Sequence, residues 1–295
     1  MTGAELKSMQ AYLTSNCLQY SDAIHVMVEQ RQQGKVFSLE EHIAALVYAQ
    51  LTPQTTWSHI VPHLAEIDQL FFDYNPDEIL KRPGEHFAQG LFALKCGNIS
   101  TTAQMNNLHK NIETMKRIVH DYGSMDAFVT SAPAQKIVAL LSNSKSKYKM
   151  AMLGEALAWE YVRNVGIDGC KPDTHLRRFL GGARMGSVTS GVATPEEVIT
   201  QVERLSQETG LPMASVDNII WSYCADNFGE VCTATPRCEK CVVRNSCKVA
   251  NSHPRKQTLF TIADITQICD TYKNDSQKIG EYFLRVVSES SKQIP

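Results

Sequence analysis

Residues 232–247 of this chain read CTATPRCEKCVVRNSC and carry four cysteines in the pattern C-x5-C-x2-C-x5-C. Four thiolates on one short segment can surround a single soft metal centre, because the chain between them is just long enough to wrap it. A structural zinc site usually takes two close cysteine pairs held roughly 12 or more residues apart. A single central pair with one cysteine on either side therefore favours a [4Fe–4S] cluster over zinc. The predicted ligands are Cys232, Cys238, Cys241 and Cys247, and the alternative is four unligated thiols.

The composition of the whole chain is typical of a globular protein. Its 295 residues are 43% hydrophobic, which is enough for a substantial core. No stretch approaches the roughly 18 uninterrupted apolar residues of a membrane span, and residues 1–10 lack the apolar centre of a secretory signal. Nine cysteines cannot all pair within one chain. We expect a soluble, intracellular, cytoplasmic monomer with no membrane contact.

Helix signals dominate the whole sequence. Ser38 and Glu41 form a capping box ahead of an apolar run, while Asn75 and Thr194 each precede a proline at a first helical position. Alternating strand patterns are scarce, so the predicted fold class is all-α. Near the C-terminus two apolar stripes at helical spacing predict two further helices with core contacts. The stripes are Ile262, Ile265, Ile268 and Cys269, and then Ile279, Tyr282, Phe283 and Val286.

The charges are unevenly distributed along the chain. The formal net charge is −2, which argues mildly against a polyanionic partner. Residues 105–187, however, hold twelve Lys and Arg against seven Asp and Glu, whereas residues 1–104 hold six against eleven. The middle of the chain is therefore where a polyanion would dock, although a surplus of this size is also typical of a solvated face.

Two motifs together resemble one known family. The stretch IIWSYCADNFGEVCTATPRCEKCVVRNSC at residues 219–247 and the stretch KPDTHLRRFLG at residues 171–181 are similar to the helix-hairpin-helix DNA glycosylases of the endonuclease III type. The second stretch corresponds to the family's Val-Asp-Thr-His motif. The family usually has six residues between its first two cluster ligands, and this chain has five. The resemblance runs from about Phe37 to Cys247.

The resemblance implies a catalytic role for Asp173, the aspartate of that motif. A carboxylate beside a scissile glycosidic bond can stabilise oxocarbenium character and assist proton transfer. An aspartate directly before a helix can also serve only as its N-cap. Both readings of Asp173 are open from the sequence.

The family's helix-hairpin-helix element corresponds to LSNSKSKYKMA at residues 141–151. Its glycines are absent here, although in the family they let backbone amides approach a DNA phosphate. In the family's bifunctional members the nucleophilic lysine stands at the start of the following helix. Matching Ala151 to a small residue of that helix gives this role to Lys149, and a shifted register would select Lys147. The interval from Lys149 to Asp173 is about six residues longer than the family's. We expect Lys145 and Lys147 to contact DNA.

The stretch LVYAQLTPQTTW at residues 46–57 resembles the family helix whose glutamine pushes into the duplex beside the extruded base. Gln50 is the corresponding residue. From spacing alone, Gln50 could equally be an exposed glutamine at a helix end with no role in DNA binding.

The expected architecture is two helical lobes with a helix-hairpin-helix element and a C-terminal iron–sulfur loop. A helical barrel covers residues 37–145, residues 1–36 and 146–250 form the second lobe, and residues 251–295 form a helical extension. The expected function is base-excision repair of double-stranded DNA carrying a damaged or mismatched base, by a glycosylase with abasic-site lyase activity. The alternatives are a monofunctional glycosylase and a non-catalytic iron–sulfur DNA-binding protein.

Overall fold

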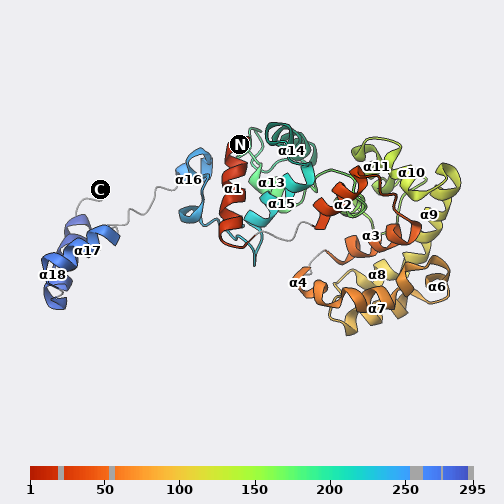
Figure 1. The fold of residues 1–295 in the computed structure, drawn as a ribbon, viewed down its shortest axis with the longest axis horizontal. Helices are drawn as coiled ribbons and strands as arrows, with labels where there is room; N and C mark the ends of the chain where they lie inside the picture. The colour runs from red at the N-terminus through yellow and green to blue at the C-terminus, as the bar shows by residue number, and fades with distance from the viewer. Residues whose placement is uncertain (19–22, 53–56, 253–261, 274, 292–295) are drawn as a thin grey trace. The chain divides into compact units, whose positions relative to one another are not determined.

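The computed structural model describes residues 1–18, 23–52, 57–252, 262–273 and 275–291. Every regular element in these ranges is a helix and none is a strand, which confirms the predicted all-α class (Figure 1). The chain divides into two compact units, Met1–Asn251 and Ser252–Pro295. None of the helices in the described ranges combines the length and the apolar character that a membrane crossing requires.

The helices of the first unit are short and numerous. The α-helices are α1 (Gly3–Ser15), α2 (Ala23–Gln32), α3 (Leu39–Leu51), α4 (Trp57–Ile60), α5 (Leu64–Leu70), α6 (Pro76–Leu80), α7 (Gly84–Ala93), α8 (Thr101–Asn106), α9 (Leu108–Tyr122), α10 (Met125–Thr130), α11 (Ala134–Ser142), α12 (Glu155–Asn164), α13 (Thr174–Phe179), α14 (Pro195–Thr209), α15 (Met213–Cys224) and α16 (Lys248–Ser252). The 3-10 helices are η1 (Val61–His63), η2 (Phe72–Tyr74), η3 (Cys238–Lys240) and η4 (Arg244–Ser246).

Three predicted helix starts are confirmed. The Ser38 hydroxyl accepts the N–H of Glu41, and the Glu41 carboxylate accepts the N–H of Ser38, which completes the capping box of α3. Thr194 caps α14 in the same reciprocal way, and the Asn75 side chain caps α6. These caps satisfy N–H groups that the first helical turn leaves without an intrahelical partner.

The larger cluster of buried side chains, here called the first core, runs from Phe37 to Val165. At its centre α3 packs against α12, and α12 packs against α11. Phe71 and Phe87 stack with their ring centroids 4.8 Å apart. Such large apolar side chains supply most of the free energy of burial.

The second core joins the N-terminal helix to the later part of the chain. Leu6, Met9 and Leu13 of α1 are fully buried in this core. Helix α1 packs against α14 and α15, and α13 packs against α15 (Figure 1). The N–H of Gly3 donates to the Glu208 carboxylate at 2.7 Å. Residues near the two ends of this unit are therefore held together by apolar burial and by polar contacts.

The two cores divide between Val165 and Cys170, whereas the predicted lobes divide between residues 145 and 146. The difference lies in α12, whose Trp159, Tyr161 and Val162 are buried in the first core. α12 packs on α3 and α11, so it belongs to the first core by its contacts.

The C-terminal unit contains two helices, α17 (Ile262–Thr271) and α18 (Ser276–Ser291), where two helices are predicted. Tyr272 and Tyr282 approach with ring centroids 5.8 Å apart. The expected core contacts are only partial, because Ile268 and Phe283 are half-buried and Ile265 is exposed. The side chains of Ile262 and Val286 lie outside the described residues.

Candidate functional site

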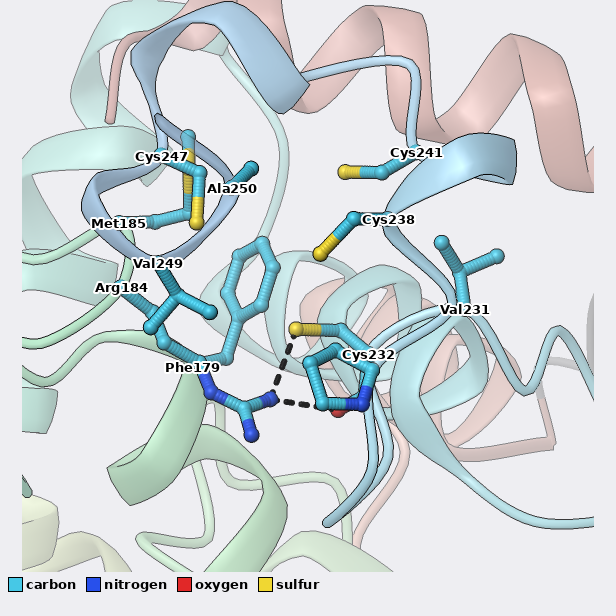
Figure 2. Close-up of a pocket in the computed structure, with 11 residues that line it drawn as sticks. Phe179, Arg184, Met185, Val231, Cys232, Cys238, Cys241, Cys247, Val249 and Ala250 are labelled. Carbon is cyan, nitrogen blue, oxygen red and sulfur yellow. Dashed lines mark hydrogen bonds between the residues drawn. The ribbon is translucent and has the colours of Figure 1, made fainter. Parts of the chain in front are cut away.

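The four cysteines predicted as ligands line one cavity in the second core. Figure 2 shows the sulfurs of Cys232, Cys238 and Cys241 on one side of the Phe179 ring and the sulfur of Cys247 on the other. The remaining wall is mainly apolar and includes Met185, Val231, Val249 and Ala250.

The cysteine loop is anchored on the C-terminal end of α15. The N–H groups of Gly229 and Val231 donate to the carbonyls of Ser222 and Tyr223 at 2.8 and 3.0 Å. A Cβ at Gly229 would lie 2.9 Å from the Ser222 carbonyl oxygen, so a larger residue would push the loop away. The loop then turns through η3 and η4, which aim the later cysteines back at the cavity.

Arg184 is a buried cation beside the first cysteine, and the sequence gives no sign of this role. It donates to the Cys232 sulfur at 2.9 Å, to the Cys232 carbonyl at 3.1 Å and to the Thr233 carbonyl at 2.9 Å (Figure 2). It stands on a glycine-rich loop, where a Cβ at Gly186 would fall only 1.7 Å from the Leu180 carbonyl oxygen. The glycines let the loop fold tightly enough to present Arg184.

Two neighbouring residues at the end of α15 also contact the cysteines. The Tyr223 hydroxyl donates to the Cys241 sulfur and accepts the N–H of Val242 at 2.9 Å. Cys224 is fully buried, as expected of a small apolar residue, but its thiol also donates to Cys232. This hydrogen bond, with help from Arg184, lowers the pKa of Cys232 to about 6. The second core therefore favours a thiolate at the first cysteine.

Among the described residues, no three His, Cys, Asp or Glu side chains converge as the ligands of one metal ion would. The four cysteine sulfurs line the same cavity but do not meet at a single point.

Asp173 is the N-cap of α13. One carboxylate oxygen, Oδ1, accepts the N–H groups of His175 at 2.8 Å and Leu176 at 3.1 Å. The other, Oδ2, accepts no hydrogen bond from any described residue, and the side chain is half-buried. Capping therefore uses one oxygen of Asp173 and leaves the other open to a further partner.

A network of buried charges lies behind Asp173. Arg163 of α12 donates to Asp217 Oδ2 at 2.9 Å, and the same oxygen accepts the Lys171 N–H at 2.5 Å. The Lys171 ammonium lies 3.3 Å from the Glu160 carboxylate. Asp173 is near enough to influence the titration of both Arg163 and Asp217. Neither Glu160, Arg163 nor Asp217 was singled out from the sequence, because their partners lie up to 54 positions away.

The predicted hairpin joins α11 to α12, which pack against each other. Its turn is held by Asn111 of α9, whose amide oxygen accepts the Ala151 N–H at 2.6 Å and whose amide nitrogen donates to the Ala151 carbonyl at 3.0 Å. Met152 adopts a left-handed conformation with a φ of 56°, which would ordinarily favour glycine. The turn keeps this conformation without a glycine because it is clamped from outside.

The three lysines of this region do not share one environment. Lys149 is half-buried and donates to the Leu153 carbonyl, and burial lowers its pKa. Lys147 is exposed and pairs with Asp121 at 2.9 Å, and Lys145 is exposed. α12 begins at Glu155, six positions after Lys149. The interval from Lys149 to Asp173 is about six residues longer than in the family, and these six positions account for the difference. Lys149 therefore lies before α12 and not at its start.

Gln50 lies near the end of α3, as expected, but its side chain is completely buried. Neither its amide oxygen nor its amide nitrogen has a hydrogen-bond partner among the described residues. A buried amide without partners costs about 1–3 kcal/mol. The exposed helix-end glutamine considered from the spacing is therefore not the arrangement found, and residues 53–56 of the same stretch lie outside the described residues.

Comparison with protein-family models, with curated proteins and with solved structures finds no match to this chain.

Proposed function

We propose that the protein is a DNA glycosylase that excises a damaged or mismatched base, with Asp173 as its catalytic carboxylate. The observation that carries this proposal is the geometry of Asp173, which caps α13 through one oxygen and leaves Oδ2 available. α13 also contributes Phe179 to the wall of the cysteine cavity. The two motifs that carry the resemblance thus meet in one core.

Such an enzyme extrudes the target nucleotide, because the glycosidic carbon cannot be reached inside a stacked duplex. The free oxygen of Asp173 would take a proton from the attacking water. Its negative charge would stabilise the positive charge that develops on the sugar as the bond to the base breaks. The departing base takes up one proton from solvent and Asp173 afterwards returns its proton to solvent, so the net reaction consumes one water and gives the free base and an abasic site.

The position of Lys149 favours the hydrolytic alternative over a lyase. A lysine nucleophile must be neutral and must face the sugar carbon. Burial lowers the pKa of Lys149, but its amine is bonded to the Leu153 carbonyl, and Glu155 is the first residue of α12. A monofunctional glycosylase, with water as the nucleophile, is therefore the form that the contacts support best.

A [4Fe–4S] cluster is the cofactor we propose for the cysteine cavity. Cys232, Cys238, Cys241 and Cys247 would hold it, since each ligand of a cubane binds a different iron and the four sulfurs need not converge on one point. The cluster would crosslink the loop to the second core. Arg184, Cys224 and Tyr223 offer hydrogen bonds to the ligand sulfurs, an arrangement common around such clusters.

The test is cleavage of a panel of duplexes, each with one oxidised, deaminated, alkylated or mismatched base, by the parent protein and by Asp173→Asn. Asparagine remains a good helix cap, so thermal stability should stay within error while excision falls by about a hundredfold or more. Equal excision by the two proteins would show that Asp173 serves only as the N-cap of α13. Binding without excision on every duplex would favour a non-catalytic DNA-binding protein.

Borohydride trapping on abasic DNA separates the two catalytic forms. A monofunctional enzyme leaves no covalent adduct. An adduct that disappears in Lys149→Gln and persists in Lys147→Gln would instead establish the lyase step and contradict the hydrolytic form.

A further inference from the structure

The segment that carries Asp173 is tied to the buried ion pair of Arg163 and Asp217. The Asp217 carboxylate accepts the Lys171 N–H at 2.5 Å, and the Asp173 N–H donates to the Lys171 carbonyl at 2.7 Å. Arg163 holds Asp217 from the other side at 2.9 Å. Asp173 is therefore joined through one residue of backbone to a pair whose side chains are 6% and 4% exposed.

The charges around this pair do not balance simply. Three carboxylates, those of Asp173, Asp217 and Glu160, share Arg163 and Lys171. Burial raises the pKa of Asp217 to about 7, although Arg163 opposes the shift, and the nearby charge of Asp173 adds to it. Crowding of like charges in a buried place is costly to stability and is more typical of functional sites than of plain structural pairs.

We propose that Asp217 and Arg163 are positioning residues for Asp173, which fix the backbone at Lys171 so that the free oxygen of Asp173 stays aimed at the reacting sugar. This inference rests on the proposed glycosylase function. Its physical basis is that small displacements of a catalytic group reduce its effectiveness steeply. Glu160 completes the arrangement by holding the Lys171 ammonium at 3.3 Å.

The first core offers a matched control. Arg31 donates to Asp126 at 2.6 and 3.2 Å, and Asp126 also accepts a backbone N–H, that of Phe37, at 3.1 Å. Each pair is thus an Arg–Asp contact with one backbone hydrogen bond to the aspartate, and Arg31 is half-buried where Arg163 is buried. Only the Asp217 pair is connected to Asp173.

The experiment compares Asp217→Ala, Asp217→Asn and Asp126→Ala in the full-length, metal-loaded protein. Single-turnover excision should fall by about tenfold or more in Asp217→Ala, with little change in the Kd for the same DNA. Asp217→Asn keeps an acceptor oxygen for the Lys171 N–H, so it should recover most of the rate. Asp126→Ala should lower the thermal midpoint without this loss of rate. Equal rate losses in Asp217→Ala and Asp126→Ala, or no recovery in Asp217→Asn, would overturn the proposal.

A second measurement does not depend on catalysis. Hydrogen exchange at the Lys171 amide should speed up by about tenfold or more in Asp217→Ala and should be unchanged in Asp126→Ala. Unchanged exchange in Asp217→Ala would overturn the anchoring itself. Altered exchange in a protein that excises no base would support the anchoring and reject the glycosylase function, so the two failures are distinguishable. Should Asp217→Ala not fold, Arg163→Met replaces it. This variant keeps the Asp217 acceptor but removes the guanidinium that holds it, so a loss of excision rate and faster exchange at the Lys171 amide are again expected, and the absence of both would overturn the proposal.

Discussion

The unit Met1–Asn251 holds two Arg–Asp pairs whose aspartates titrate in opposite directions: Arg31–Asp126 at the first core, and Arg163–Asp217 between α12 of the first core and α15 of the second. In the first core burial opposes ionisation of Asp126, yet the hydrogen bonds from Arg31 and the Phe37 N–H keep its pKa below the ordinary value. At the boundary between the two cores burial outweighs Arg163, and the charges of Asp173 and Glu160 add to the effect, so the pKa of Asp217 rises. The Asp126 pair thus contributes to stability, whereas the crowded charges around Asp217 lower stability beside a candidate site.

The largest expected difference between the two cores is their response to removal of one cysteine ligand, because only the second core contains the cysteine cavity. The parent protein should be brown with about four irons per chain. Cys241→Ser should lose the metal almost entirely, because three thiolates cannot complete the set. The loop from Ala225 to Ala250 should then become accessible to proteases, while the first core stays protected from hydrogen exchange.

Cys96→Ser is the control for that experiment, since Cys96 is a fully buried cysteine of the first core. It should retain its iron. Colourless parent protein with one zinc per chain would contradict the cluster and support the zinc alternative.

Acid should weaken the first core through His42. Burial lowers the pKa of His42 from 6.5 to about 4, while its Nδ1 lies 2.7 Å from the Tyr161 hydroxyl. The unfolded chain binds this proton more tightly, so the stabilisation is complete above pH 6.5 and falls by about 3 kcal/mol as the pH drops towards 4. His42→Gln keeps a polar partner for Tyr161 and should show a shallower fall in urea-unfolding free energy between pH 6.5 and 4.5. Parallel curves for the two proteins would show that His42 is not responsible.

Asp217 should act with the opposite sign. Because its folded pKa is raised from 3.8 to about 7, the folded chain binds this proton more tightly. Its contribution is complete below about pH 4 and is lost as the pH rises through 7. Asp217→Asn should therefore gain free energy of unfolding relative to the parent from pH 5 to pH 8. A constant difference over this range would mean that Asp217 stays ionised, as Asp126 does.

The smallest expected effect is that of Lys147→Gln. This exposed side chain pairs with Asp121 and lies 4.7 Å from the centre of the Tyr148 ring. The thermal midpoint of the Lys147→Gln protein should equal that of the parent within error, because solvent screens such exposed ion pairs. If Lys147 binds a DNA phosphate, the dependence of log K on log salt should become shallower by about one unit. An unchanged slope would limit Lys147 to its contact with Asp121.

Much of the fold could be predicted from local signals. The caps at Ser38, Asn75 and Thr194 depend on residues two or three positions apart, so the sequence displays them directly. The four cysteines likewise lie close along the chain, and their common cavity follows from that spacing.

Other features depend on distant contacts that no local pattern contains. Arg184 reaches Cys232 over 48 positions, and Asn111 reaches Ala151 over 40. Gln50 fits an exposed helix end by spacing, but the surrounding helices bury it. The start of α12 at Glu155 depends on a distant contact in the same way, because the turn before it contains no glycine to mark it and is held by Asn111 from another helix.

The packing of α1 has a consequence for synthesis of the chain. Its apolar face, with Leu6, Met9 and Leu13, is covered by α14 and α15, which leave the ribosome about 200 residues later. At about 5–20 residues per second this delay is roughly 10–40 s. The first core can be complete within that time, but the apolar face of α1 cannot yet be covered. A nascent chain therefore exposes the apolar face of α1 until α15 emerges, and the second core closes after the first.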